Sequence, residues 1–160
     1  MKRWLKIRSK FTKRRKPVLN AKNVAEYFLS IVDVDNGDSL SNLKIQKLLY
    51  YSQGFSLAIF RGVIFPEKIV AWNLGPVVVE IYEEYSKYGN GPVPLPEDFD
   101  LTIYPDAEKE LLDEVFSVYG QFSAGALVEM THDEPPWRNT KPNNEISLKH
   151  MQDFFSKQLK

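Results

Sequence analysis

The sequence contains no cysteine, which excludes disulfide bonds, thiolate zinc sites and cysteine nucleophiles. This absence is compatible with a reducing cytoplasm, where we expect the protein to be. No apolar run reaches the roughly 18 residues of a membrane-spanning helix, and the N-terminus lacks the continuous apolar segment of a secretory signal. The 160 residues, 43% hydrophobic and 26% charged, therefore predict one soluble intracellular domain with its own core.

Acidic residues are absent from the first 16 positions, which contain nine basic ones. The rest of the chain holds 12 basic and 21 acidic residues, a net charge of −9. We therefore divide the chain into a basic arm, residues 1–17, and a domain, residues 18–160. Trp4, Ile7 and Phe11 would form one apolar face if the arm were helical.

Two interpretations of the arm are open: a mobile, solvated extension, or a segment that touches nucleic acid, an anionic partner or the protein's own acidic body. The candidates for nucleic-acid contact are Lys2, Arg3, Arg8, Lys13, Arg14, Arg15 and Lys16.

Apolar residues recur at helical spacing in six segments of the domain. These segments are 20–33, 42–61, 77–88, 106–119, 123–130 and 147–160. The second is apolar almost all round, which is typical of a central helix, and Gly54 within it predicts the close approach of another backbone. The pattern predicts a mainly α fold, a single globular domain of about six helices.

Between the second and third helical segments, β-branched and aromatic residues predict a short extended or β-hairpin insertion near residues 63–73. In the following "AWNLGPV", Gly75 permits a backbone conformation that other residues resist, and Pro76 suits the first turn of a helix. Trp72 is either a core anchor or an exposed contact for a partner.

The stretch "THDEPPW", residues 131–137, predicts a structural turn. Thr131 and Glu134 have the spacing of a capping box, His132 can bond a carbonyl or carboxylate, and the Trp137 N–H needs an acceptor. Partner contact, or metal and acid–base chemistry through His132, Asp133 and Glu134, are the alternatives. Adjacent residues rarely aim at one ion, so we predict no metal site, no cofactor and no catalytic residue.

Four stretches, in this order, resemble one known family: "LKIQKLLYYSQGFSLAIF", "IVAWNLGPVVVEIYEEY", "LLDEVFSVYGQFSAGALVEMTHDEPPW" and "ISLKHMQDFFSK". The family is the Panacea domain of SocA-like antitoxins, whose members are often labelled phage-associated proteins. Ser52 and Phe55 stand where the family usually has alanine and tryptophan. The resemblance implies a non-enzymatic protein that neutralises a toxin encoded beside it by forming a complex.

We therefore expect a cytoplasmic antitoxin that binds a co-encoded toxin directly and does not contact a membrane. The sequence does not indicate an oligomeric state. Gln46, Lys47 and Gln53, a polar stripe that is either solvated or a recognition edge, and Trp72 are the candidates for partner contact. The alternative is a nucleic-acid-binding regulator, an autorepressor or adaptor, that uses the basic arm. A third hypothesis is a metal-assisted hydrolase built on His132, Asp133 and Glu134.

Overall fold

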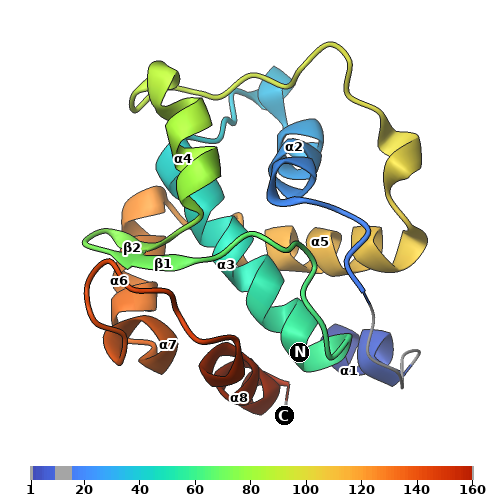
Figure 1. Cartoon of the computed structure of the whole chain (residues 1–160). Coiled ribbons are helices and arrows are strands. Elements are labelled where there is room, and N and C mark those ends of the chain that lie inside the picture. The colour runs from blue at the N-terminus through green and yellow to red at the C-terminus, as the bar shows by residue number, and fades with distance from the viewer. Residues whose placement is uncertain (1, 10–15, 160) are drawn as a thin grey trace.

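Helix α3 (Asn42–Ile59) runs through the middle of the molecule, and the other elements pack around it (Figure 1). The computed structural model describes residues 2–9 and 16–159. Ser41 caps α3 by accepting a hydrogen bond from the amide of Lys44, and 16 of the 18 residues of the helix are buried. The prediction of a central helix that is apolar almost all round is confirmed.

The other five predicted helices are present and surround α3 (Figure 1). They are α2 (Ala21–Ile31), α4 (Val79–Tyr85), α5 (Asp106–Tyr119), α6 (Ala124–His132) and α8 (Leu148–Gln158). Asn20 caps α2 and Ser123 caps α6, each by accepting a hydrogen bond from a backbone amide of the first turn. The mainly α, single-domain fold is therefore confirmed.

Four short elements were not predicted. They are α7 (Pro135–Arg138) and the 3-10 turns η1 (Val34–Asn36), η2 (Ser86–Tyr88) and η3 (Leu101–Ile103). Each is a single turn, too short to show a hydrophobic period. With α1, the part of the chain that the structure describes contains eight α-helices.

Gly54 lies where α8 crosses α3. A Cβ atom at this position would be 2.1 Å from Cε2 of Phe155, so the glycine makes room for an aromatic ring. The predicted close approach of another backbone at this glycine is wrong in kind. A side chain approaches the helix instead, because Phe155 is fully buried against Phe55 and Tyr50.

The predicted hairpin is formed by β1 (Val70–Trp72) and β2 (Gly75–Val77), which pair antiparallel with Trp72 opposite Gly75. It extends beyond the predicted residues 63–73, because the turn is formed by Asn73 and Leu74. Pro76 lies within β2 and not in the first turn of α4, which corrects the sequence interpretation. The free edge of a sheet tolerates a proline because its missing N–H has no strand to pair with.

Helix α1 (Lys2–Ser9) packs against α5 and α3 at the lower end of the molecule in Figure 1. Trp4 is 1% exposed and stacks on Phe55, with ring centroids 4.0 Å apart, and Ile7 is also buried. Arg3 forms an ion pair of 3.2 Å with the buried Glu114 of α5. Of the apolar face predicted for the arm, Trp4 and Ile7 thus contact the protein's own body, and Phe11 lies outside the described residues.

Candidate functional site

The turn between β1 and β2 is the centre of the candidate site, because the two most distinctive sequence motifs meet there. Asn73 and Leu74 keep negative φ angles, and Gly75 completes the reversal with φ +103°. A turn followed by a residue with positive φ is a common way to close a hairpin, and that φ favours glycine. The predicted role of Gly75 is confirmed by this backbone angle.

The outer edge of β2 is covered by polar side chains of α3. Gln46 accepts a hydrogen bond of 2.9 Å from the amide of Val78, and the Lys47 ammonium donates one of 2.9 Å to the carbonyl of Pro76. These side chains take the place that a third strand would occupy. Edge groups that would otherwise be unpaired in the core are satisfied in this way.

Gln46, Lys47 and Gln53 are each 0–1% exposed. Gln53 bonds the backbone of the segment before β1, accepting from the amide of Ile64 and donating to the carbonyl of Phe65. The predicted polar stripe is therefore neither solvated nor an exposed recognition edge. The sequence interpretation missed this because buried loops, whose amides and carbonyls need partners, leave no periodic signal.

Thr131 of α6 packs against the hairpin from the opposite side. A Cβ atom at Gly75 would lie 2.7 Å from Oγ1 of Thr131 and 2.8 Å from Cε of Lys47. Thr131 is fully buried and donates its hydroxyl hydrogen to the carbonyl of Val128 within α6. Glycine is thus required at position 75 by both backbone angle and space.

Two rings of the "THDEPPW" segment hold the turn by its carbonyl groups. Trp137 donates from Nε1 to the carbonyl of Trp72 at 2.8 Å, and Nε2 of His132 lies 3.0 Å from the carbonyl of Asn73. The rings of His132 and Trp137 stack, with centroids 4.1 Å apart. Both predicted hydrogen-bond roles are therefore found, with the hairpin as the acceptor.

Glu134 does not form the predicted capping box. Thr131 is inside α6 and not at its start, and the Glu134 carboxylate turns into the core, where it accepts hydrogen bonds of 3.0 Å from Tyr50 and Tyr51. The spacing suited a cap, but a pair of buried tyrosine hydroxyls on α3 provides the partners. The sequence signal that could have indicated this is the adjacent Tyr50 and Tyr51 in an otherwise apolar helix.

Burial shifts the pKa values of two ionisable groups beneath the hairpin. It raises the pKa of the Glu134 carboxyl to about 7, although the hydrogen bonds from Tyr51 and Tyr50 favour the charged form. It lowers the pKa of the Lys47 ammonium to about 7. Burial, and then the Glu134 charge, raise the pKa of Tyr51 far above its usual range, so its hydroxyl stays a hydrogen-bond donor.

His132, Asp133 and Glu134 do not converge on one point. His132 faces the hairpin, Asp133 is exposed and Glu134 faces the tyrosines of α3. Within residues 2–9 and 16–159, no group of three metal-ligating side chains could hold a metal ion. The polar groups of the site instead fix the shape of the turn.

The outward side of the turn is formed by the half-buried Trp72, a predicted candidate for partner contact, and by Leu74 and Tyr82. The sequence did not indicate Leu74 or Tyr82 as part of the site.

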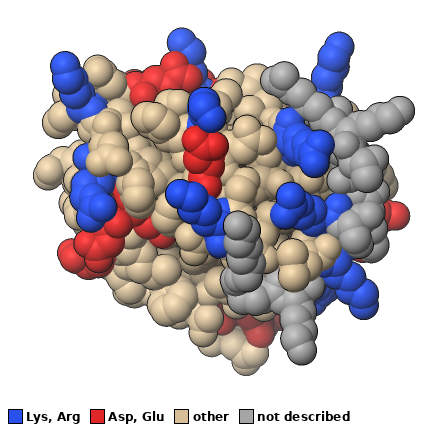
Figure 2. Space-filling view, turned by 90° about the horizontal axis from the view of Figure 1, so that it is seen from below, with Lys and Arg blue, Asp and Glu red and all other residues tan. Residues whose placement is uncertain are grey.

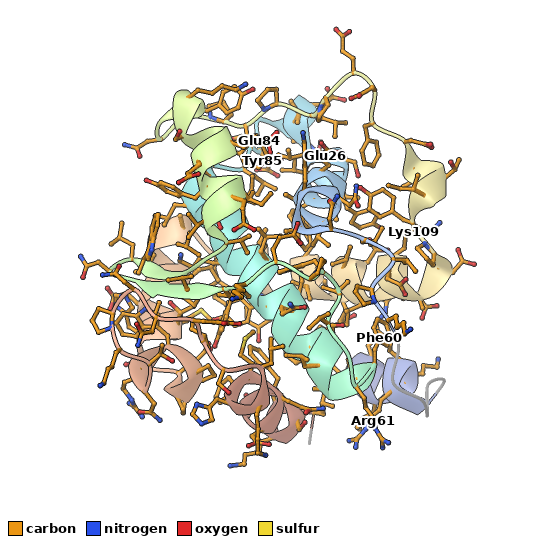
Figure 3. All side chains as sticks on the ribbon, in the orientation of Figure 1. Glu26, Phe60, Arg61, Glu84, Tyr85 and Lys109 are labelled. Carbon is orange, nitrogen blue, oxygen red and sulfur yellow. The ribbon has the colours of Figure 1, made fainter. Side chains whose placement is uncertain are left out.

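The candidate nucleic-acid residues divide between described and undescribed parts of the chain. Lys2, Arg3 and Arg8 lie in α1, and the side chains of Arg3, Arg8 and Lys16 are exposed. Lys13, Arg14 and Arg15 lie outside the described residues. Figure 2, which views the molecule from below, shows basic side chains spread over this end, with fewer acidic ones between them. Figure 3 shows Arg61 at the C-terminal end of α3, pointing outward at the same end.

Comparison with known families gives one match. A family model described as antitoxin SocA-like, Panacea domain, matches residues 45–138, which include the hairpin, both motifs and most of α3. No curated protein and no solved structure matches the sequence. None of the described helices has the length and apolar character needed to cross a membrane.

Proposed function

This chain belongs to the family of SocA-like antitoxins with a Panacea domain, and from that membership we propose that it neutralises a co-encoded toxin by direct protein–protein binding. The observation that carries the proposal is the family match over residues 45–138, a segment that contains the whole hairpin site. We further propose that the protein acts without catalysis and in the cytoplasm. The side chains of Gln46, Lys47 and Glu134 hold the protein's own backbone or core through hydrogen bonds. This internal use supports a binding role instead of a catalytic one.

The test uses the reading frame next to the gene for this chain. Its product, expressed alone, should stop growth, and co-expression of this chain should restore growth. The two purified proteins should also elute together from a size-exclusion column. A neighbouring product that is harmless, or that remains toxic when this chain is present and folded, contradicts the proposal.

A second candidate function is regulatory binding of nucleic acid through the arm, residues 1–17. It is favoured by Arg8 of α1 and by Lys16, whose basic side chains are exposed. Backbone phosphates would be contacted by such a surface without any choice of sequence. The division of the chain into this arm and a domain over 18–160 is part of the same proposal.

Deletion of the arm is a poor test, since it would also remove the buried Trp4 and Ile7. The better variant is the charge reversal Arg8→Glu with Lys16→Glu, both at exposed positions. Binding to the promoter DNA of its own operon should weaken, and its salt dependence should fall by about 0.9 log units per log unit of salt for each lost phosphate contact. The control is Lys87→Glu with Lys141→Glu, exposed and outside the arm. Equal effects of the two pairs contradict a role for the arm.

A further inference from the structure

The turn of the hairpin and its neighbours form a largely apolar surface, which we call the hairpin face. It consists of Trp72, Leu74, Tyr82, His132 and Trp137. Leu74 is 53% exposed and Tyr82 is 36% exposed, while the three other rings are half-buried. Contacts between its members make the surface continuous: Trp72 packs edge-on against Tyr82, with ring centroids 5.0 Å apart, and Trp137 bonds the carbonyl of Trp72.

The hairpin face is held rigid from below. The carbonyl groups of Trp72, Asn73 and Pro76 are each bound by a side chain from another element, namely Trp137, His132 and Lys47. A surface that is already fixed loses little conformational entropy when a partner binds. Aromatic side chains at the centre of an interface are also the ones that most often dominate its binding energy.

Leu74 has no structural reason to be apolar. Its position in the turn has negative φ and accepts most residues, and more than half of its surface is in water. Asn or Asp would be the usual choices in such a turn. A leucine here leaves apolar surface in water at the tip of the hairpin.

The two segments that supply the hairpin face are acidic, although the exposed Arg138 directly follows Trp137. The segments 69–86 and 110–137, which supply all five of its residues, contain no lysine or arginine. Exposed carboxylates on the same segments include Glu80, Glu83 and Glu129. Basic side chains are spread over the end that Figure 2 shows, where acidic side chains also lie among them.

We propose that the hairpin face is the surface with which this chain binds its toxin, and that the toxin offers an apolar pocket edged by lysine and arginine. The inference rests on the proposed function and adds the site and the chemistry of the partner. Leu74 and Tyr82 enter the pocket, Trp72 lies beside them, and the carboxylates of α4 and α6 face the basic rim. Attraction between the two rims raises the association rate, while the apolar centre sets the dissociation rate.

The test compares two exposed apolar residues of the hairpin face with two matched controls elsewhere. Leu74→Ser is paired with Leu101→Ser, since these leucines are 53% and 50% exposed. Tyr82→Ser is paired with Phe122→Ser, and both of these rings are 36% exposed. Leu101 lies in η3 and Phe122 precedes α6, away from the turn. Melting temperature and affinity for the purified toxin are measured for all four variants.

We expect the four variants to melt within a few degrees of one another, and the two hairpin-face variants to bind the toxin at least about tenfold more weakly than their controls. If the unchanged protein binds the toxin and Leu74→Ser and Tyr82→Ser bind it equally well, the site is wrong while the antitoxin function stands. If the unchanged protein does not bind the toxin at all, the proposed function fails and this inference fails with it.

A second measurement tests the chemistry of the partner. Glu83→Gln with Glu129→Gln should slow association at low salt by about tenfold relative to Glu97→Gln with Asp98→Asn, which removes the same charge from an exposed loop. Equal association rates for the two double variants would contradict the proposed basic rim of the toxin's pocket. The remaining candidate to occupy the hairpin face is a second copy of this chain, and sedimentation velocity tests for it. If Leu74→Ser abolishes self-association of this chain and leaves toxin binding unchanged, the hairpin face joins two copies of the chain and the inference is overturned.

Discussion

At the scale of single residues, the stability of the hairpin site depends on two buried ionisable groups, Lys47 on α3 and Glu134 beside it. Glu134 is held by tyrosine hydroxyls and Lys47 by the carbonyl of Pro76. In both cases burial favours the uncharged form, so both pKa values lie near 7. Below neutral pH the shift of Glu134 makes the free energy of unfolding fall with rising pH, and above neutral pH the shift of Lys47 makes it rise.

The pKa of Glu134 rises from 4.5 to about 7 on folding, so the folded state binds more protons between those values and stability falls as pH rises through them. The pKa of Lys47 falls from 10.5 to about 7, so stability rises with pH above about 7. Each group contributes a slope of at most about 1.4 kcal/mol per pH unit. Urea unfolding from pH 5 to 10 should show Glu134→Gln removing the first slope and Lys47→Met removing the second. Unchanged slopes in the variants would show that these groups do not titrate with folding.

Trp137 offers a test of a single hydrogen bond. Trp137→Phe keeps an aromatic ring beside His132 but removes the N–H that binds the carbonyl of Trp72. Leaving that carbonyl without its partner should lower the free energy of unfolding by about 1–3 kcal/mol. Toxin affinity measured on the folded variant should also fall, because the turn that presents Leu74 becomes less well fixed. A loss of stability with full affinity would separate the scaffold from the binding surface.

At the scale of secondary-structure elements, the contact between α3 and α8 depends on the lack of a side chain at Gly54. Gly54→Ala places a methyl group against the ring of Phe155, and overpacking of this kind costs about 1–3 kcal/mol. Gly125→Ala in α6 is the matched control, because a Cβ atom there would meet open space. The control should be neutral or should gain up to about 1 kcal/mol from helix propensity. Thermal unfolding of both variants checks this, and a stable Gly54→Ala variant would show that Phe155 can move aside.

The elements that could be predicted from the sequence are those with a period. Helices α2, α3, α5, α6 and α8 repeat apolar residues over at least two turns, and polar caps define where α2, α3 and α6 begin. Pairings between distant segments could not be predicted in the same way. Nothing in the spacing of Thr131 and Glu134 distinguishes a local cap from a carboxylate directed at Tyr50 and Tyr51, because that contact joins positions more than 80 residues apart.

The candidate site shows the same division. Gly75, His132 and Trp137 were recognised as structural because their chemistry demands a special backbone angle or a hydrogen-bond acceptor. The sequence favours a surface position for Lys47, Gln46 and Gln53, since long polar side chains are usually solvated. Only the fold shows that these three side chains replace a missing strand and hold the loop before the hairpin.

At the scale of the whole molecule, the charges of the chain are unevenly distributed. The basic residues of α1 lie at one end, and the segments around the hairpin face carry carboxylates without a lysine or arginine. Such a distribution orients an approaching charged partner before contact. A basic toxin would be attracted to the hairpin and repelled by the arm, while nucleic acid would be drawn to the arm. The two proposed functions therefore need not compete for one surface.

Helix α1 nevertheless does more than carry charge, because it covers part of the core. Trp4 is buried on Phe55 and Ile7 is buried beside it, although residues 2–9 lie outside the segment that matches the family model. Deletion of residues 1–9 should uncover these contacts and cost about 3–5 kcal/mol, the usual loss for removing a buried tryptophan. For a chain of this size the melting temperature should fall by on the order of 10 °C.

The full-length variant Trp4→Ala should reproduce most of that loss, since it removes the same contact without shortening the chain. Arg3→Gln should lose less, because the Arg3 side chain of its ion pair with Glu114 is 64% exposed. Calorimetry of the deletion variant, Trp4→Ala and Arg3→Gln separates the contribution of packing to stability from the contribution of the ion pair. If the truncated chain melted at the same temperature as the full one, α1 would be a dispensable carrier of basic residues and the domain would begin, as the sequence predicts, after residue 17.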